Sequence, residues 1–284
     1  MWRTSSKTLK FIAGVMAVIA LTGCATVEMP VVSRDDMFQA AVREGFKKQY
    51  LFAPPFVLTA YHKSAGASDT LVVYIEGDGY AWSSRTMPSD DPTPRHPLAF
   101  FLASEDQSPH VLYLARPGQF LADASPQVDQ AYWTSKRYSE EVIQSTNAAI
   151  DQVKLSSGAG KVSLVGYSGG AAVAVLVAAR RNDVIALRTV AGNLAPEVFT
   201  RLHHLSPLTG SLDPMAVALA VKGIPQRHFI GRRDAVVTRA VTEAFLDAEG
   251  DDSRQSLTEV DGADHLNGWA ERWGVFIKLE CVRQ

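Results

Sequence analysis

The sequence predicts an α/β fold in which a mostly parallel sheet carries helices on both faces. The first observation behind this prediction is that short apolar, β-branched runs alternate along the chain with longer helical segments. The second is that a hairpin-like pair of strands precedes this alternation, which indicates an antiparallel edge. The third is that the candidate functional residues follow the ends of predicted strands, where sheets of this class bind their ligands.

The composition is typical of a soluble globular protein. The 284 residues are 46% hydrophobic and 20% charged, which suits one domain of the larger α/β kind. Cys24 and Cys281 are the only cysteines. If Cys24 is modified, Cys281 has no partner and a disulfide framework is not expected.

Residues 1–23 have the features of an export signal. Three basic residues begin the segment, and residues 11–21 form an apolar run that is too short to span a bilayer comfortably. The sequence Leu-Thr-Gly-Cys that ends at Cys24 resembles the lipobox of bacterial lipoproteins. This resemblance implies cleavage before Cys24 and a lipid attached to it. The alternative is an ordinary secretory signal followed by a chance cysteine.

A lipid on Cys24 would anchor the protein to a membrane surface. Ala25 stands where aspartate is the usual inner-membrane retention signal, so we expect the outer membrane, facing the periplasm. We divide the chain into a signal peptide at 1–23, a lipidated tether with a first helix at 24–50, and the main domain at 51–284. Without the signal, 25 basic residues stand against 30 acidic ones, a formal charge of −5. This balance argues against nucleic acid as a partner.

Apolar runs locate the elements of the main domain. Two strand-like runs at residues 56–62 and 70–75 are joined by a turn-rich connection that suits a hairpin. A proline-rich loop covers residues 87–97, and a second loop-rich stretch covers residues 191–223. Further strands are predicted at 111–115, 162–165, 186–190, 227–230 and 256–260, and helices at 97–104, 135–156, 171–179, 236–246 and 266–281.

The strand at 162–165 and the Ala-rich helix at 171–179 enclose the pattern Gly-x-Ser-x-Gly. Gly166 and Gly170 stand on either side of Ser168. A strand that turns directly into a helix strains the residue between them and leaves no room for a Cβ on its neighbours. The pattern therefore predicts a nucleophile elbow with an exposed hydroxyl at Ser168. The alternative is an ordinary Gly-rich turn.

A serine hydroxyl becomes reactive when a histidine accepts its proton and an acid orients that histidine. Among the seven histidines, His265 follows the last predicted strand, where the topology would bring a base to Ser168. Asp234 follows the strand before it and is the first choice for the acid, with helix capping as its alternative role. Asp264 and Asp261 are rival acids.

The chain order Ser168, Asp234, His265 is the order of the α/β-hydrolases. Together with the elbow pattern, it makes the chain from about residue 56 to its end resemble an α/β-hydrolase of the serine esterase or lipase type. The resemblance implies an eight-stranded sheet and acyl transfer through a covalent acyl-enzyme. We therefore expect a serine hydrolase that cleaves a small-molecule carboxylic ester, with Ser168 as nucleophile, His265 as base and Asp234 as the acid.

The same resemblance implies an oxyanion hole built from two backbone N–H groups. One belongs to Gly169, the residue after the nucleophile. The other comes from the loop after residue 75, where many relatives have His-Gly and this chain has Glu76-Gly77-Asp78-Gly79. We assign the second donor to Asp78 and expect its carboxylate to point elsewhere; the alternative is a plain loop.

The sequence lacks the motifs for phosphate, dinucleotide or metal binding. Residues 158–162 lack two features of a phosphate loop, and residues 77–82 lack the third glycine of a dinucleotide fingerprint. No cluster of Cys, His and acidic residues has metal-site spacing, so neither a metal nor another cofactor is expected. Two alternatives stay open: a non-catalytic lipoprotein that uses this fold as a binding module, and a peptidase or acyltransferase that uses the same three residues. Four aromatic residues are candidates for lining an acyl pocket, with burial in the core as the expected role of at least half of them: Tyr80, Trp82, Tyr132 and Trp133.

Overall fold

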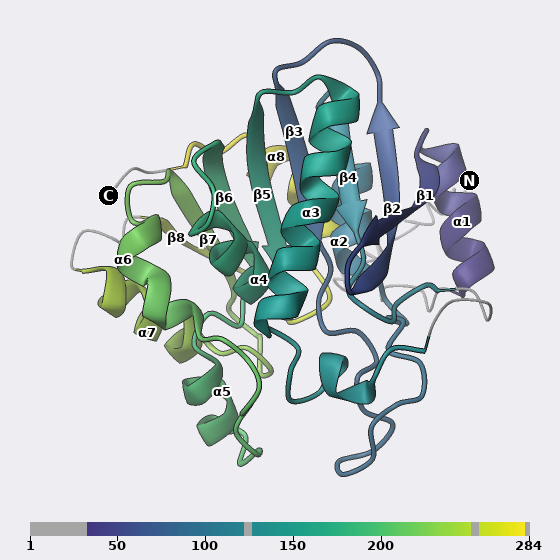
Figure 1. Cartoon of the computed structure of the whole chain (residues 1–284). Helices are drawn as coiled ribbons and strands as arrows, with labels where there is room; N and C mark the ends of the chain where they lie inside the picture. Colours follow the sequence, from purple (N-terminus) through teal and green to yellow (C-terminus); the bar gives the residue numbers. More distant parts are fainter. Residues whose placement is uncertain (1–32, 122–126, 251–255, 282–284) are drawn as a thin grey trace, which may run out of the picture.

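The computed structural model describes residues 33–121, 127–250 and 256–281, and within them eight strands form one sheet (Figure 1). The strand order across the sheet is β1-β2-β4-β3-β5-β6-β7-β8. Every neighbouring pair from β4 to β8 is parallel, whereas β2 is antiparallel to both β1 and β4. The predicted mostly parallel, eight-stranded sheet is therefore confirmed. The strands are β1 (Lys47–Ala53), β2 (Phe56–Ser64), β3 (Thr70–Ile75), β4 (His110–Leu114), β5 (Lys161–Tyr167), β6 (Val184–Val190), β7 (Gln226–Gly231) and β8 (Leu257–Val260).

The predicted hairpin between residues 56–62 and 70–75 is wrong. β2 pairs with β1 and β4, and β3 lies between β4 and β5. In β3 the five residues after Thr70 are all buried, which suits a strand with neighbours on both sides. The hairpin at this edge is formed by β1 and β2, and the polar start of β1, at Lys47 and Lys48, hides that strand from a search for apolar runs.

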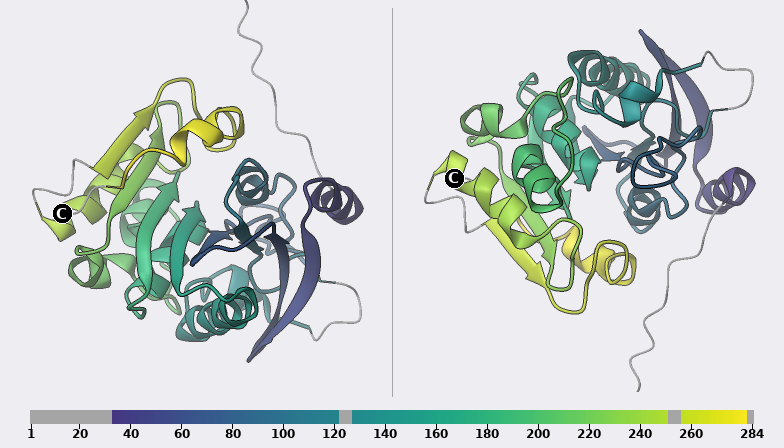
Figure 2. Two further views of the ribbon diagram at one scale, coloured as in Figure 1. Left: turned by 90° about the horizontal axis from the view of Figure 1, so that it is seen from above. Right: turned by 90° about the horizontal axis from the view of Figure 1, so that it is seen from below.

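Helices form a layer on each face of the sheet (Figure 2). One face is covered by α3 and α4, which lie side by side, with α6 and α7 next to them (Figure 1). The other face carries α2 and α8, and α1 packs into the same cluster of buried side chains. The helices are α1 (Arg34–Arg43), α2 (Leu98–Ser104), α3 (Glu140–Ser157), α4 (Gly169–Ala178), α5 (Pro196–Leu202), α6 (Ala218–Val221), α7 (Arg239–Glu249) and α8 (Ala270–Phe276), with 3₁₀ turns η1 (Gln130–Trp133) and η2 (Pro214–Val217).

The central helix α4 is buried along its whole length. All ten of its residues are buried between β5, β6 and α3, which explains why its sequence has no polar face. Small side chains are required because a helix surrounded in this way has no room for larger ones. Its burial fixes the position of its first residue, Gly169, against the end of β5.

Two helices are shorter than predicted. The helix expected at 135–156 begins at Glu140, because Ser139 has the extended backbone of a helix N-cap. The helix expected at 266–281 is reduced to Ala270–Phe276, because Gly268 has a φ of +86° that a helix does not accommodate.

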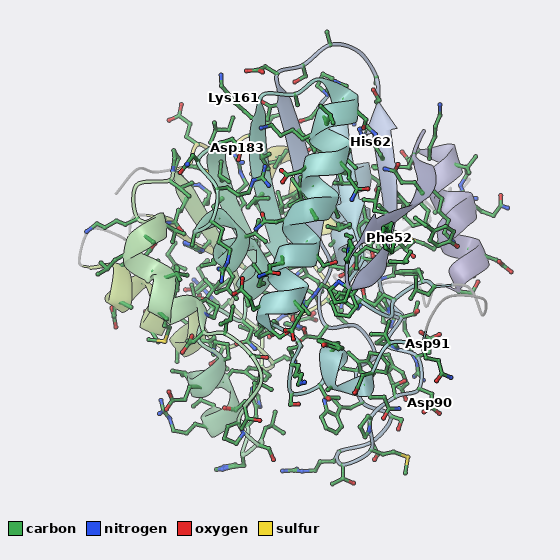
Figure 3. All side chains as sticks on the ribbon, in the orientation of Figure 1. Phe52, His62, Asp90, Asp91, Lys161 and Asp183 are labelled. Atoms are coloured by element: carbon green, nitrogen blue, oxygen red, sulfur yellow. The ribbon has the colours of Figure 1, made fainter. Side chains whose placement is uncertain are left out.

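The carboxyl ends of β3, β5, β7 and β8 meet at one edge of the sheet, as parallel strands require. The loop with Asp90 and Asp91 lies at this end of the molecule, and Lys161 and Asp183 lie at the other (Figure 3). The sheet begins at Lys47, before the boundary that we placed at residue 51. The expected signal peptide and Cys24 lie outside the described residues. None of the helices within the described ranges has the length and apolar character needed to cross a membrane.

Candidate active site

The turn between β5 and α4 holds Ser168 in a strained conformation. Its φ of 50° and ψ of −119° lie where residues other than glycine are rarely found. A Cβ on Gly166 would lie 2.4 Å from the Cα of Ala171, and a Cβ on Gly170 would lie 2.3 Å from the backbone oxygen of Ile75. Both flanking positions therefore require glycine, for the reason that the motif suggested.

Ser168, His265 and Asp234 form a continuous series of hydrogen-bonding contacts. His265 Nε2 lies 3.0 Å from Ser168 Oγ, and His265 Nδ1 lies 2.9 Å from Asp234 Oδ2. The Asp234 side chain is completely buried, whereas His265 keeps 16% of its side chain exposed. A proton on Nδ1 is the arrangement that suits an acidic partner, and it leaves Nε2 free to accept the serine proton.

Asp234 also shapes the loop after β7. Its Oδ1 accepts hydrogen bonds from the backbone N–H groups of Val236 and Val237, both at 2.8 Å. The helix-capping role considered from the sequence is wrong, because α7 begins at Arg239 and its N-cap is Thr238. One oxygen of the Asp234 carboxylate instead holds the loop, and the other contacts His265. The rival acids have other partners: Asp264 accepts from the backbone of Leu266 and Asn267, and Asp261 pairs with Arg232 at 2.9 Å.

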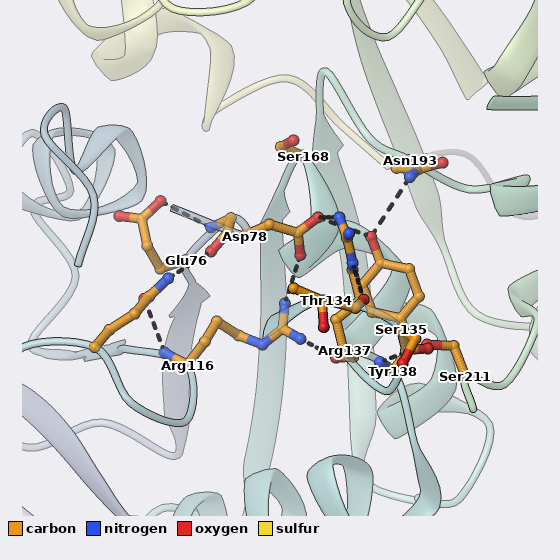
Figure 4. A network of polar contacts seen from close by, with 12 residues as sticks. Glu76, Asp78, Arg116, Thr134, Ser135, Arg137, Tyr138, Ser168, Asn193 and Ser211 are labelled. Carbon is orange, nitrogen blue, oxygen red and sulfur yellow. Dashed lines mark hydrogen bonds and ion pairs between the residues drawn. The ribbon is translucent and has the colours of Figure 1, made fainter. Parts of the chain in front are cut away.

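The loop after β3 approaches the start of α4. A Cβ on Gly169 would lie 2.1 Å from Asp78 Oδ1, so the Asp78 side chain lies directly against Gly169. The carboxylate is turned toward two arginines: Oδ2 lies 2.7 Å from Arg137 Nη1, and Oδ1 lies 3.4 Å from Arg116 Nη1 (Figure 4). The two residues assigned to the oxyanion hole are thus neighbours. Neither arginine was predicted from the sequence to belong to the site.

Two further buried groups support these loops. Tyr167 donates a hydrogen bond from its hydroxyl to the backbone oxygen of His265 at 3.0 Å. Glu76 is 1% exposed, and burial raises the pKa of its carboxyl to about 7, although Gly77 and Tyr113 donate hydrogen bonds to it. Glu76 and Arg116 follow the ends of predicted strands, and this position could have identified them as candidate site residues. Arg137 does not follow a strand, so the sequence gives no such indication for it.

Ser168 and His265 line a pocket of about 460 Å³. Tyr80 and Trp82 also line it, whereas Trp133 is buried with its ring N–H bonded to the backbone of Ser89, and Tyr132 packs against Phe56. Two of the four aromatic candidates therefore line this pocket, and the other two pack elsewhere. The wall also includes apolar side chains from Phe199, Val236, Val237 and Leu266 and polar ones from Arg95, Arg137 and Asn193.

Within the described ranges, no group of three or more His, Cys, Asp and Glu side chains is placed to hold a metal ion. The histidine and the acids of the site are instead engaged in the hydrogen bonds given above. The arrangement suits proton transfer from a serine hydroxyl.

Comparisons with known proteins identify the fold. No protein-family model matches the chain, and no curated protein matches its sequence. Among solved structures, it is similar to an α/β serine hydrolase homologue from Coxiella burnetii, with 15% identity, a TM-score of 0.52 and coverage of 78% of this chain and 89% of that one. It is also similar to an esterase from Pyrococcus furiosus, with 17% identity, a TM-score of 0.56 and coverage of 92% and 100%.

A third similar structure is an acylaminoacyl peptidase from Pyrococcus horikoshii, with 13% identity and a TM-score of 0.58. The match covers 78% of this chain and 38% of that longer one. Together with the observed strand order, these similarities show that the chain has the α/β-hydrolase fold, as predicted.

Proposed function

We propose that this α/β-hydrolase-fold protein is a serine hydrolase that cleaves carboxylic esters through an acyl-enzyme. The observation that carries the proposal is the hydrogen-bonded series from Ser168 through His265 to Asp234, with Ser168 and His265 opening onto a pocket. A fold alone does not establish an activity, and the geometry of these three side chains supplies the chemical argument.

The reaction begins when Ser168 Oγ attacks the ester carbonyl. His265 Nε2 takes the serine proton as the C–O bond forms, and the buried Asp234 carboxylate stabilises the resulting imidazolium. His265 then gives the proton to the leaving alcohol, which departs and leaves the acyl group on Ser168. Water enters, loses a proton to His265 and releases the acid, and the returned proton restores the serine.

The negative charge that develops on the carbonyl oxygen needs hydrogen-bond donors. We assign them to the backbone N–H groups of Gly169 and Asp78. The side chain of Asp78 lies against Gly169. Gly169 begins α4, whose positive dipole end favours the oxyanion. Such preorganised donors contribute about 100- to 1000-fold each to the rate.

The pocket suits a small or medium acyl group. A space of about 460 Å³ with Phe199, Val236 and Val237 on its wall accommodates an apolar chain. The similar structures include an esterase and a peptidase, so an amide is the competing substrate class. Esters are the proposal because an alcohol is the better leaving group and demands less of the site.

We also propose that the protein is held at the outer membrane, facing the periplasm, by lipid on Cys24. The support is the lipobox-like sequence before that residue. Labelled palmitate should enter the wild type and not Cys24→Ala, and the variant should move from the membrane to the soluble fraction. Equal labelling of both proteins would reject the anchor.

A fluorophosphonate probe tests the proposed activity. It should label the wild type and leave Ser168→Ala unlabelled. Ser156→Ala, which removes an exposed hydroxyl on α3, is the matched control and should be labelled like the wild type. Nitrophenyl esters of increasing chain length then define the acyl preference. An inert wild type, with no hydrolysis across the ester series, would favour the non-catalytic binding module instead.

A further inference from the structure

The side chain of Asp78 occupies a position that conflicts with the proposed chemistry. It lies against Gly169, one of the two residues to which we assign the oxyanion hole. Two negative charges about 4 Å apart, at an effective dielectric constant of about 20, repel each other by about 4 kcal/mol, which corresponds to roughly a thousandfold in rate. An aspartate here is compatible with catalysis only if its charge is cancelled.

Two buried arginines provide this cancellation. Arg137 Nη1 lies 2.7 Å from one carboxylate oxygen of Asp78, and Arg116 Nη1 lies 3.4 Å from the other. Both arginines are less than a tenth exposed. Tyr138 donates a third contact to the carboxylate at 3.2 Å, and its pKa is raised by burial, so its hydroxyl stays protonated. Two cations and one carboxylate leave a net charge of +1.

The arginines are themselves fixed in place. Arg137 Nε donates to the backbone oxygen of Thr134 at 2.6 Å, and Arg116 Nη2 donates to the backbone oxygen of Arg137. Figure 4 shows these residues as one connected network extending from Glu76 past Ser168 to Asn193. A guanidinium that is anchored through its backbone contacts cannot follow the carboxylate if the loop moves, so it defines where Asp78 lies.

The loop that carries Asp78 is held on both sides of that residue. Gln119 donates from Nε2 to the backbone oxygen of Gly77 and accepts from the backbone N–H of Arg116, both at 3.0 Å. Gly79 has a φ of +67°, and a Cβ there would lie 2.1 Å from the backbone oxygen of Pro92. The orientation of the Asp78 N–H is therefore set by its surroundings.

We infer that Arg137, assisted by Arg116, is a positioning residue for the oxyanion hole. Arg137 cancels the charge of the Asp78 carboxylate and holds the backbone N–H of Asp78 in place. The inference rests on the proposed serine-hydrolase function. It explains how this chain carries an aspartate at the residue whose N–H is assigned to the oxyanion hole. It also means that the Asp78 side chain and Arg137 depend on each other: the cation is required because the carboxylate is present.

This dependence gives a rescue experiment with a neutral nitrophenyl ester. Arg137→Gln should lower kcat roughly 10- to 100-fold with little change in KM, since Arg116 still offsets part of the charge. Asp78→Asn combined with Arg137→Gln keeps the backbone N–H and removes the carboxylate. The kcat of this double variant should be at least about tenfold higher than that of Arg137→Gln alone. Arg137→Lys keeps the cation and should lie between the wild type and Arg137→Gln.

The matched control is Arg180→Gln. Arg180 pairs with Glu140 at 2.6 Å at the end of α4 remote from Ser168, so this variant also breaks an arginine–carboxylate pair and should keep the wild-type kcat. If Arg137→Gln does not fold, the double variant decides the matter, because replacing both partners of a buried pair is tolerated better than removing one. Folding of each variant is checked by its thermal melting curve.

Three results would overturn the inference. The first is a folded Arg137→Gln variant with the wild-type kcat. The second is a folded double variant that is no more active than Arg137→Gln, or whose kcat is more than about 100-fold below that of the wild type. The third is an effect of Arg137→Gln that is confined to KM, which would make Arg137 a substrate-binding group. Ser168-dependent turnover of the wild type is measured in the same series. Its absence would reject the proposed function and this inference with it, whereas its presence beside any of the three results rejects this inference alone.

Discussion

The Tyr167 hydroxyl donates a hydrogen bond to the backbone oxygen of His265, 3.0 Å away, although 98 positions separate the two residues in the chain. Their rings also lie close, with centroids 5.4 Å apart. Tyr167 is the residue immediately before the proposed nucleophile and is 5% exposed. One buried side chain at the elbow therefore supports the loop that carries the proposed base.

Replacement of Tyr167 by Phe tests this support. The change leaves the backbone oxygen of His265 without its donor, and we expect a stability loss of about 1 kcal/mol in urea denaturation. Looser placement of the imidazole should lower kcat roughly 3- to 30-fold. Tyr50→Phe, on the exposed edge strand β1, should change neither quantity. A Tyr167→Phe variant with wild-type kcat would show that the loop holds its position without this bond.

Asp234→Asn separates the two roles of that residue. The amide oxygen can still accept from Val236 and Val237, so we expect the free energy of unfolding to change by less than about 1 kcal/mol. Loss of the carboxylate beside His265 Nδ1 should lower kcat about 10⁴-fold. Asp264→Asn is the matched control, since Asp264 binds the backbone of Leu266 and Asn267, and should stay within about tenfold of the wild type. Equal losses in both variants would contradict the choice of acid.

Replacement of glycine by alanine should have opposite effects on stability at Gly170 and at Gly274. A Cβ on Gly170 would lie 2.3 Å from the backbone oxygen of Ile75, so Gly170→Ala should destabilise the protein by about 1–3 kcal/mol or more. A Cβ on Gly274 in α8 meets no atom within 4 Å, and its φ is not positive, so Gly274→Ala should stabilise by about 0.5–1 kcal/mol. Denaturant unfolding of both variants gives the comparison. A destabilised Gly274→Ala would indicate that α8 needs its glycine for another reason.

The parts of the fold that the sequence predicted are those determined by local patterns. The strand β5 and helix α4 follow from one apolar run interrupted by Gly166 and Gly170, because the crowding that excludes a Cβ is a property of that turn. The contact of Asp234 with His265 follows from topology, since both residues stand at the ends of neighbouring parallel strands.

The parts that were missed depend on partners distant in sequence. β2 pairs with β4, which is distant in the sequence, and not with β3, which follows it directly. The turn-rich connection between β2 and β3 gives no sign of this pairing. Arg137 lies 59 positions from Asp78 in a segment without regular structure. Nothing local distinguishes such an arginine from one on the surface, so its role becomes visible only with the contact itself.

Glu76 is expected to make the stability of the protein depend on pH. Its carboxyl is 1% exposed at the end of β3, and burial raises its pKa from 4.5 to about 7 in the folded protein. Between these two values, the folded state binds more protons than the unfolded state. The stability therefore falls as the pH rises through this window: the full stability is present below about pH 4.5, and the loss is complete above about pH 7.

The expected loss from this one group is roughly 3 kcal/mol, as an order of magnitude. Urea denaturation of the wild type and Glu76→Gln at a series of pH values from 5 to 8 measures it as the difference between two curves, in which the contributions of all other groups cancel. The wild-type free energy of unfolding should fall relative to the variant as the pH rises, because glutamine carries no proton to lose. Glu105→Gln, which removes an exposed carboxyl after α2, should follow the wild-type curve. Parallel curves for the wild type and Glu76→Gln would mean that hydrogen bonds from Gly77 and Tyr113 offset the burial of the charge.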